Sequence, residues 1–208
     1  IAGNSAVTNG GGIRNLATLN SLNSIIAGNT QTGNVSDLTG NAIAAGSNYI
    51  VGIPNGTTVS QLLATDANGI PRLATQGGPT PTIGLVAGSA GLAAGGVVAN
   101  LATPIGVNDN SMTVIDAKFL AAGELLRIDS EIVLVTGVNG TIVSLSRAQV
   151  GTVAAIHAAG QGITLAFDQT GFLRFANDLG AAEFNSAPTD IGLSNASIDE
   201  GQTIGTTV

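Results

Sequence analysis

The sequence contains no cysteine and no tryptophan, and aromatic residues make up only 3% of its 208 residues. Without cysteine there is neither a disulfide scaffold nor a thiolate metal site. With so few aromatic rings, the stacking platforms that bind sugars and single-stranded nucleic acids are scarce. These absences narrow the classes of function before any motif is considered.

Charged residues are also scarce, at 9% of the chain, and the six Lys and Arg residues are scattered singly. Nucleic-acid binding requires clustered cations that displace counterions from phosphates. The formal net charge is −7. We therefore expect no nucleic-acid partner, and an acidic, cysteine-free chain is compatible with secretion from bacteria.

Long hydrophobic runs are missing as well. Residues 73–108 carry no charge, but glycines, Asn100 and Pro104 interrupt them, whereas a spanning helix needs about 20 predominantly apolar residues. We expect no membrane insertion in this segment. The chain starts at Ile1 without an initiator Met or a visible signal peptide, so we expect a processed product or a piece of a longer protein.

What the chain does contain is 30 glycines and 44% hydrophobic residues, mostly Ala, Val, Ile and Leu. Small and β-branched residues mixed with Gly, Asn, Ser and Thr favour strands and tight turns. Glycine and the β-branched residues are weak helix formers. The composition therefore predicts an all-β protein.

A short repeat predicts a solenoid. Ile1-Ala2-Gly3-Asn4 recurs 25 residues later as Ile26-Ala27-Gly28-Asn29, and Leu38-Thr39-Gly40-Asn41 is a weaker echo. Such a period fits one turn of a β-solenoid, in which inward Leu, Ile and Val stack from turn to turn. At least one of Ile25 and Ile26 must point inward, because neighbouring strand residues face opposite sides. The alternative is a chance tetrapeptide match in a chain rich in Gly and Asn.

Several short pieces occur in a fixed order before residue 97: Gly11-Gly12-Ile13-Arg14-Asn15, Asn23-Ser24-Ile25-Ile26-Ala27-Gly28-Asn29, Asp37-Leu38-Thr39-Gly40-Asn41, Gln76-Gly77-Gly78-Pro79-Thr80-Pro81-Thr82 and Gly88-Ser89-Ala90. Together they resemble the C-terminal region of right-handed parallel β-helix repeat proteins of bacterial surfaces. That family has a pectin-lyase-like architecture and includes polymorphic outer-membrane and adhesin-like proteins. The resemblance implies the end of a right-handed parallel β-helix.

The family usually continues with an Asp-Gln-Arg-Gly segment and closes on an Asp-Ile-Gly-Ala-x-Glu segment. Residues 168–174 and 178–184 of this chain resemble these two segments. Two departures stand out. Alanine near Ala93 replaces the family's usual acidic residue, and some seventy residues separate Gly96 from Asp168 where the family has a short connection.

Residues 113–162 account for most of that separation and resemble the short β modules of phage-tail and surface proteins. The likeness rests on Leu126-Arg127-Ile128-Asp129-Ser130-Glu131 and Ser146-Arg147-Ala148-Gln149-Val150-Gly151-Thr152. Asn139-Gly140 between two β-rich runs predicts a hairpin. Gly123 argues against a long helix in residues 117–126. An insertion of this kind is expected to leave and re-enter at neighbouring surface points.

The predicted fold class is thus all-β, a right-handed parallel β-helix end with an inserted small antiparallel β module. The predicted divisions are β-helix coils and a C-terminal extension over residues 1–96, the module over 97–162 and a return to the β-helix over 163–184. Residues 185–208 form a linker and, by resemblance at residues 185–194, the first strand of a cadherin-like domain.

Acids and bases of the helix part are few. Glycan-cleaving β-helices use clustered Asp, often with Ca²⁺, together with an Arg or Lys base. Here the acids are Asp37 and Asp66, and the bases are Arg14 and Arg72. Asp37 and Asp66 are just over one turn apart along the chain, and this spacing allows the two acids to stack on one another. We interpret Asp37 as a solvated turn residue, because exposed carboxylates are the rule.

The inserted module contains the single histidine, His157, for which the sequence offers no triad partner. We interpret it as a structural histidine on the surface. Asp129 and Glu131 alternate on one strand face, which indicates either a cation-binding pair or, as we prefer, a solvent-facing charged stripe. Asn108-Asp109-Asn110 lacks the other ligands of a calcium loop. We therefore assign no catalytic, cofactor-binding or metal-binding residue and expect a protein that is not an enzyme.

These observations predict a non-catalytic structural or adhesive module of a large secreted or cell-surface bacterial protein. The expected partners are further copies of itself or other surface and matrix proteins, with head-to-tail assembly into a filament through the tail. The alternative is a polysaccharide-binding or polysaccharide-cleaving, lyase-like β-helix, whose partner is a glycan. Clustered Asp and Arg on one face would favour that alternative.

Overall fold

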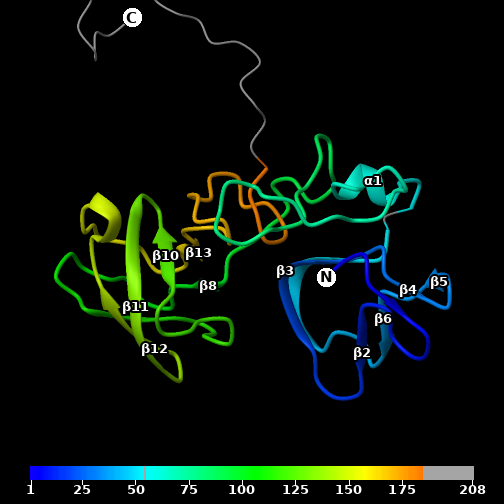
Figure 1. Cartoon of the computed structure of the whole chain (residues 1–208). Coiled ribbons are helices and arrows are strands. Elements are labelled where there is room, and N and C mark those ends of the chain that lie inside the picture. The colour runs from blue at the N-terminus through cyan, green and yellow to red at the C-terminus, as the bar shows by residue number, and fades with distance from the viewer. Residues whose placement is uncertain (54, 185–208) are drawn as a thin grey trace, which may run out of the picture.

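The computed structural model describes residues 1–53 and 55–184. Strands and turns dominate it, and the helical segments are α1 (Val59–Leu62) and the single 3₁₀ turn η1 (Gln149–Gly151). The predicted all-β class is therefore confirmed. Figure 1 shows two strand-rich parts beside each other, blue turns and a green-to-yellow sheet, with teal and orange segments above them.

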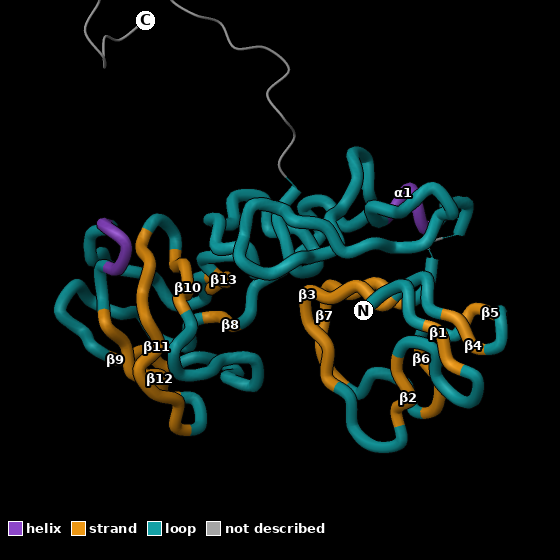
Figure 2. Tube along the Cα trace, in the orientation of Figure 1, coloured by secondary structure: helices purple, strands orange, loops and turns teal. Residues whose placement is uncertain are grey.

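The first part consists of two consecutive turns of chain, residues 1–25 and 26–50, stacked in parallel (Figure 2). Its parallel pairs are β1 (Ser5–Ala6) with β4 (Thr30–Gln31), β2 (Ile13–Asn15) with β6 (Leu38–Gly40), and β3 (Asn20–Ile26) with β7 (Ala45–Val51). Each pair keeps one offset of 25 residues, as in Ser5↔Thr30 and Ile13↔Leu38. The repeat read from the sequence is therefore a repeat of structure. A short strand, β5 (Asn34–Val35), pairs antiparallel with β4.

Strand β3 bends at Asn23, whose φ of 48° lies in the left-handed region. Asparagine tolerates that region better than most residues. On the far side of the bend both Ile25 and Ile26 are buried. Ile25 packs against residues of the segment that covers the turns, so Ile26, its neighbour, faces the interior of the turn. The expectation that one isoleucine points inward is met, and the other is covered from outside.

The covering layer combines two segments that are distant in sequence. Residues 55–96 include α1, and residues 166–184 return beside them, with Gly95 N donating to Asn177 O and Leu179 N donating to Gly91 O. Figure 1 shows these teal and orange segments together above the blue turns. The apolar core between the layer and the turns contains Ile25, Ala27, Leu62, Leu63, Leu85 and Leu179.

The second part is a curled six-stranded antiparallel sheet in the order β8-β13-β10-β11-β12-β9. Its strands are β8 (Ala99–Asn100), β9 (Ser111–Thr113), β10 (Leu125–Ile128), β11 (Glu131–Asn139), β12 (Ile142–Ser146) and β13 (Gly162–Leu165). The curl brings the two outer strands close, since a bridge joins Leu101 to Val114 just beyond them. Leu126, Ile128, Val133, Val143 and Ile163 are among the residues of its apolar core. We call residues 97–165 the sheet module.

The predicted hairpin is present as β11 and β12, but its turn lies one residue further on. Asn139 is the last residue of β11 and pairs with Ile142, so the two loop residues are Gly140 and Thr141. Gly140 has a φ of 60°, which glycine adopts without a steric penalty. Residues 117–124 form turns and no helix, as Gly123 led us to expect, and β10 begins at Leu125.

The chain leaves and re-enters the sheet module at neighbouring points. Ala99 of β8 pairs with Ile163 of β13, and Asn100 pairs with Gly162. The module also touches the turns, because Leu22 of β3 packs on its core. Just ahead of the module, the Asn23 side chain bonds both the N–H and the C=O of Gly96. The division of the chain into domains remains a prediction, and the cadherin-like strand lies outside the described residues.

We expect a chain that lacks about residues 100–160, closed by a short Gly-Ser link, to keep its two stacked turns. Ala99, the last residue before the deletion, pairs with Ile163, two residues after the first retained residue Gln161, so a short link spans the gap. Circular dichroism and amide exchange of β3 and β7 measure the outcome. Because the deletion uncovers Leu22, a matched variant with Leu22→Ser guards against aggregation. Loss of β structure in both variants would mean that the module belongs to the core of the turns.

Candidate functional site

A set of four interacting side chains that includes Glu131 and Arg147 lies inside the sheet module. Glu131 begins β11, and Asp129 lies in the two-residue turn that connects β10 to β11. Arg147 directly follows β12, and His157 lies in a later segment that forms a bridge with Ile105. The fold thus collects these four side chains from three stretches of sequence. We call them the Glu131 cluster.

Glu131 has no exposed surface, and every contact of its carboxylate is internal. Arg147 donates to both oxygens, with Nε 2.8 Å from Oε1 and Nη2 2.7 Å from Oε2. The backbone N–H of Ala148 donates to Oε1 and that of Ala155 to Oε2, both at 3.0 Å. His157 Nε2 lies 2.9 Å from Oε2. The carboxylate is therefore saturated with donors.

His157 is 1% exposed and has a carboxylate at each ring nitrogen. Its Nδ1 lies 2.7 Å from Asp129 Oδ2, opposite the contact of Nε2 with Glu131. An ionised carboxylate only accepts hydrogen bonds, so each carboxylate is placed to accept from the ring nitrogen that faces it. The buried charge of Glu131 is balanced by the guanidinium of Arg147, since a buried ion needs a paired counterion.

Electrostatics agree with this arrangement. Burial by itself raises the pKa of Glu131, but the hydrogen bonds from Arg147, His157, Ala155 and Ala148 outweigh burial and lower the pKa to about 2. The hydrogen bond to Glu131 raises the pKa of the Arg147 guanidinium above its ordinary value. Glu131 is thus a permanent anion at neutral pH, and Arg147 is its permanent counterion.

The cluster also fixes the surrounding loops. Arg147 donates to the carbonyl oxygens of Gly106, Asp109 and Ala155. The loop after Arg147 has positive φ at Ala148 and at Val150, which is strained for a β-branched residue. Such strain persists only where neighbouring contacts over-determine the backbone. We interpret the Glu131 cluster as a structural clamp, because its acid is saturated and has no open path to a substrate.

Two sequence interpretations are wrong here. His157 is structural but buried rather than on the surface, and it has two carboxylate partners. Asp129 and Glu131 do not form a solvent-facing stripe, because Glu131 points into the interior while Asp129 is half exposed in a turn. Asp109 accepts a hydrogen bond from Gly106 N and serves its own loop. Within residues 1–53 and 55–184, no three His, Asp or Glu side chains are placed to hold a metal ion.

A second buried network joins the two segments that resemble the family's closing motifs. Asp168 accepts hydrogen bonds from the backbone N–H groups of Thr170, Phe172 and Glu183 and from the Thr170 hydroxyl. Arg174 pairs with Glu183 at 3.2 Å and donates to the carbonyl oxygens of Asp178 and Gly180. The resemblance concerned only the order of residues 168–174 and 178–184 along the chain. The structure adds that they form one connected unit.

Asp178 connects that unit to the covering layer. Its carboxylate accepts from Ala93 N at 2.7 Å and from Phe184 N at 2.7 Å. For Asp168, burial raises the pKa, but the hydrogen bond from the Thr170 hydroxyl and three backbone bonds outweigh it and lower the pKa. Both aspartates are occupied by donors from their own chain.

A third network runs through the stacked turns. Asn29 is fully buried and accepts at Oδ1 from both N and Nδ2 of Asn4, 25 residues earlier. Asn29 in turn donates from N and Nδ2 to Asp37 Oδ1, at 2.7 and 2.8 Å. Asp37 is therefore buried, and its interpretation as a solvated residue is wrong. We call Asn4, Asn29 and Asp37 the amide ladder.

The other acid and bases of the helix part lie apart from the ladder. Asp66 accepts from the backbone N–H groups of Asn68 and Ile70 in its own turn. Arg14 and Arg72 are exposed. Among the described residues, no hydrogen bond or ion pair connects Asp66 to Asp37, so the acids do not form the cluster that a lyase would need.

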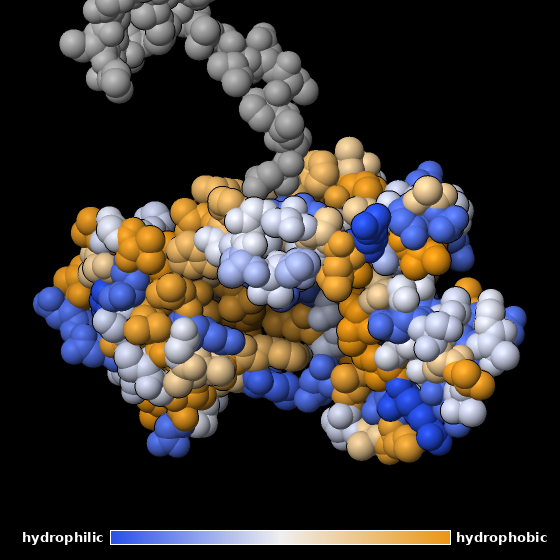
Figure 3. Space-filling view, viewed as in Figure 1, coloured by the Kyte–Doolittle hydropathy of each residue, from blue (hydrophilic) through white to orange (hydrophobic). Residues whose placement is uncertain are grey.

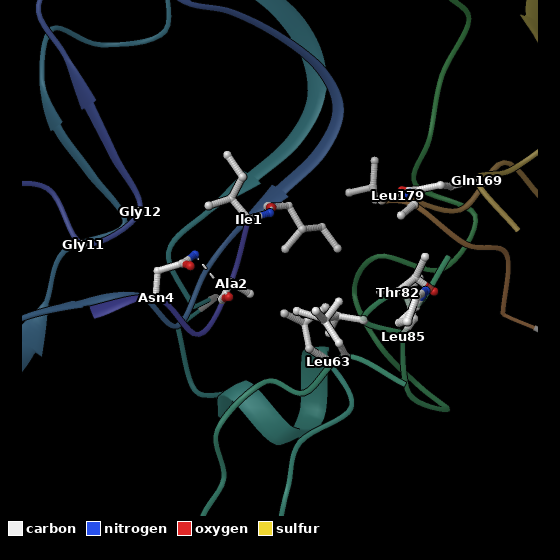
Figure 4. Close-up of a pocket in the computed structure, with 16 residues that line it drawn as sticks. Ile1, Ala2, Asn4, Gly11, Gly12, Leu63, Thr82, Leu85, Gln169 and Leu179 are labelled. Atoms are coloured by element: carbon white, nitrogen blue, oxygen red, sulfur yellow. Dashed lines mark hydrogen bonds between the residues drawn. The ribbon is translucent and has the colours of Figure 1, made fainter. Parts of the chain in front are cut away.

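Two hollows adjoin the stacked turns. A cleft of about 670 Å³ lies between the first turn and the covering layer, and its lining includes Ile25, Leu63, Leu85, Leu179, Asn4 and Gln169. Figure 4 shows Asn4 on the side of the turns and Gln169 beside Leu179. A second hollow of about 550 Å³ is lined by β3 together with Ile13, Leu19 and Phe119. Figure 3 shows apolar surface in the depression between the turns and the sheet module.

Neither a protein family, nor a curated protein, nor a solved structure matches this chain. In the described residues no helix is long and apolar enough to cross a bilayer.

The lowered pKa of Glu131 predicts an acid-sensitive sheet module. The ordinary pKa of the carboxyl is 4.5 and its pKa in the fold is about 2. A group with a lowered folded pKa stabilises the fold above its unfolded pKa and loses that contribution as the pH falls through the folded value. We therefore expect stability to decline between pH 4.5 and about 2, measured as the urea midpoint against pH. A Glu131→Gln variant with an unchanged acid slope would contradict this assignment.

Proposed function

We propose that this chain is a non-catalytic structural or adhesive module of a large secreted or cell-surface bacterial protein. In this proposal the two stacked turns are the end of a right-handed parallel β-helix, and the sheet module is an insertion in it. The observation that carries the proposal is the parallel stacking of residues 1–25 on residues 26–50 at one constant offset. Such stacking builds length and rigidity from a short repeated unit.

The buried polar groups support a structural role. In the Glu131 cluster and around Asp168 and Asp178, the carboxylates accept hydrogen bonds from their own chain, so they hold loops together. A catalytic acid or base needs an accessible oxygen within reach of a substrate. The ordered likeness of residues 1–96 and 168–184 to surface β-helix proteins supports the extracellular location.

The alternative, a polysaccharide-binding or polysaccharide-cleaving β-helix, is favoured by the cleft beneath the covering layer. Its volume of about 670 Å³ suits a small ligand, and the amides of Asn4 and Gln169 could bond to sugar hydroxyls. Its lining contains no acidic, Arg or Lys side chain and no aromatic ring. We therefore expect neither elimination chemistry nor tight glycan binding.

Incubation with acidic polysaccharides, followed by detection of unsaturated products, tests the two candidates. We expect no such product, and calorimetric titration with the same polysaccharides is expected to show no heat of binding. Gln169→Ala is the matched control, because it removes an amide of the cleft and leaves the amide ladder in place. Products or binding that disappear in this variant would establish the glycan alternative and overturn our proposal.

Head-to-tail assembly through residues 185–208, which lie outside the described residues, belongs to the same proposal. A free strand edge readily accepts a strand from another chain, and a heterologous contact of that kind generates an open filament unless its rotation closes. Sedimentation of the chain with and without residues 185–208 measures the contribution of the tail. We expect association only in the longer chain. The same assembly state in both would show that the tail donates no strand.

A further inference from the structure

A small pocket lies between the two segments of the covering layer. Its volume is about 110 Å³, and its lining includes Gln76, Gly84, Thr170, Phe172, Glu183 and Phe184. The aromatic residues of the whole chain are five Phe and one Tyr. Two of these few rings therefore lie at one pocket, together with a carboxylate. We call it the Glu183 pocket.

One carboxylate oxygen of Glu183 is left without a partner by its own chain. The side chain is 5% exposed. It accepts hydrogen bonds from Arg174 Nη1 and from the N–H of Asp178, and both go to Oε1, at 3.2 Å. Among the described residues no group donates to Oε2, and Oε2 is not one of the fully enclosed oxygens that lack a partner. It is thus open to a donor from outside the chain.

The segment that supplies Glu183 has an excess of negative charge. Residues 166–184 contain three acids and one cation, Asp168, Asp178, Glu183 and Arg174, which gives a formal net charge of −2. Arg127 of β10 donates to the carbonyl oxygen of Arg174 and adds one positive charge. Among these groups one negative charge remains without a counterion, and its field favours a cationic ligand.

Glycines hold the walls of the pocket in place. A Cβ added at Gly78 would overlap the backbone of Thr170, and one added at Gly77 would lie 3.0 Å from Phe172 Cε2. Gly77 also has a φ of 90°, which glycine adopts without a steric penalty. Only glycine allows the first covering segment to approach the second this closely. The backbone around the pocket is therefore fixed before a ligand arrives, which lowers the cost of binding.

We propose that the Glu183 pocket binds the end of a primary alkylammonium group. The ammonium donates one N–H to Glu183 Oε2 and another to the amide oxygen of Gln76, and its methylene groups lie against Phe172 and Phe184. Aromatic rings attract a cation over their faces, but they offer no ligand to replace the water of an inorganic ion. Pockets that bury a drug-sized ligand have about 300–1,000 Å³, so this smaller one fits the end of a single chain.

The ammonium is expected to come from another molecule. Lys118 is the only lysine of the chain, and its ammonium lies 3.8 Å from Asp116 in the sheet module. Residues 185–208 contain neither Lys nor Arg. Two sources share the required chemistry, a lysine side chain of another protein and a free aliphatic amine. The inference goes beyond the function proposed above and does not depend on the stacked turns, because the pocket is lined by the covering layer.

Titration of the full chain with n-butylammonium chloride, followed by NMR of the backbone amides, tests the site. We expect saturable shifts at Gln76, Gly84 and Glu183 and none in the Glu131 cluster. The matched ligand is 1-butanol, which has the same chain length and no charge, and NaCl controls for ionic strength. Nα-acetyl-lysine methylamide separates the two sources. Tighter binding than that of n-butylammonium indicates a lysine of a protein, and weaker binding indicates a free amine.

Phe172→Leu keeps an apolar side chain at the pocket and removes one ring. We expect it to bind n-butylammonium about two- to fivefold more weakly, as the loss of one cation–π contact predicts. Phe175→Leu is the matched control, because Phe175 is 79% exposed and does not line the pocket. It is expected to bind as the parent does. Glu183→Gln removes the charge and is expected to weaken binding by at least about tenfold.

Equal shifts with 1-butanol would overturn the inference, because the pocket would then have no preference for a cation. Shifts that grow with the amine concentration without saturating would overturn it too. So would equal effects of Phe172→Leu and Phe175→Leu, which would place the binding elsewhere. Glu183 also holds Arg174, so if Glu183→Gln unfolds the covering layer, the comparison of the two phenylalanine variants decides the outcome.

Discussion

Glu131→Gln is expected to lower the free energy of unfolding of the sheet module by about 3–5 kcal/mol, the usual cost of breaking a buried ion pair by removing one partner. The substitution keeps the size of the side chain but leaves the buried guanidinium of Arg147 and the ring of His157 facing a neutral amide. The amide also replaces one accepting oxygen with an NH₂ group, which is a donor. That group then faces N–H donors of the cluster, and two donors cannot form a hydrogen bond with each other. Urea denaturation at neutral pH, followed by circular dichroism, measures the loss.

Asp116→Asn is the matched control, since it removes one carboxylate charge from the surface of the same module. The Asp116 side chain is 63% exposed and lies 3.8 Å from Lys118. Such surface pairs contribute about 0–1 kcal/mol. Amide exchange locates each effect, and we expect the loss in Glu131→Gln to be confined to β8–β13. If the two variants lost equal stability, the Glu131 cluster would have no role as a clamp.

The elements that could be predicted from the sequence are those specified locally. The repeat at Ile1 and Ile26 revealed the stacking because an identical tetrapeptide marks the same corner in both turns. The hairpin was visible in its two β-rich runs, whereas its turn was displaced by one residue. Register decides that detail, since Asn139 is held in β11 by its pairing with Ile142.

The buried charges could not be predicted from the sequence. Glu131, Arg147 and His157 are separated by 16 and 10 positions, and a charged residue taken alone is expected at the surface. Only tertiary pairing turns each of them inward. Two of the three lie in the pieces that resemble phage-tail and surface modules, and this was the one available signal that they belong together. His157 lies outside those pieces, so its partners remained hidden.

Asp37 illustrates the same limit within the repeat. The asparagine of each Ile-Ala-Gly-Asn copy was recognised as a repeated corner residue, but nothing in the spacing showed which group follows Asn29 in the ladder. The return of the chain at Asp37 after eight residues supplies that group. An acid that receives two donors from one neighbour can be buried, although its second oxygen, Oδ2, has no hydrogen-bond partner.

Ile26→Asp is expected to unfold the stacked turns or to destabilise them by several kcal/mol, about 4 or more. Ile26 is 2% exposed, and its carbonyl oxygen accepts from Gly52 N in the next level of the stack. An aspartate at this position would place an unpaired charge among apolar side chains and leave the space of the isoleucine partly empty. Ile25→Asp is expected to have an effect of the same order, because Ile25 is buried against Leu62, Leu85 and Leu179.

Val7→Asp serves as the control, because it introduces the same charge into the same turn at a position that is 84% exposed. We expect its thermal unfolding to stay within about 0.5 kcal/mol of the parent, as for most surface substitutions. Thermal unfolding followed by circular dichroism compares the three variants, and amide exchange shows whether the sheet module survives in each. The module has its own apolar core around Leu126 and Val143, so we expect it to stay folded when the turns do not. If Ile25→Asp and Ile26→Asp both unfolded like the parent, β3 would not be the strand that holds the two turns together.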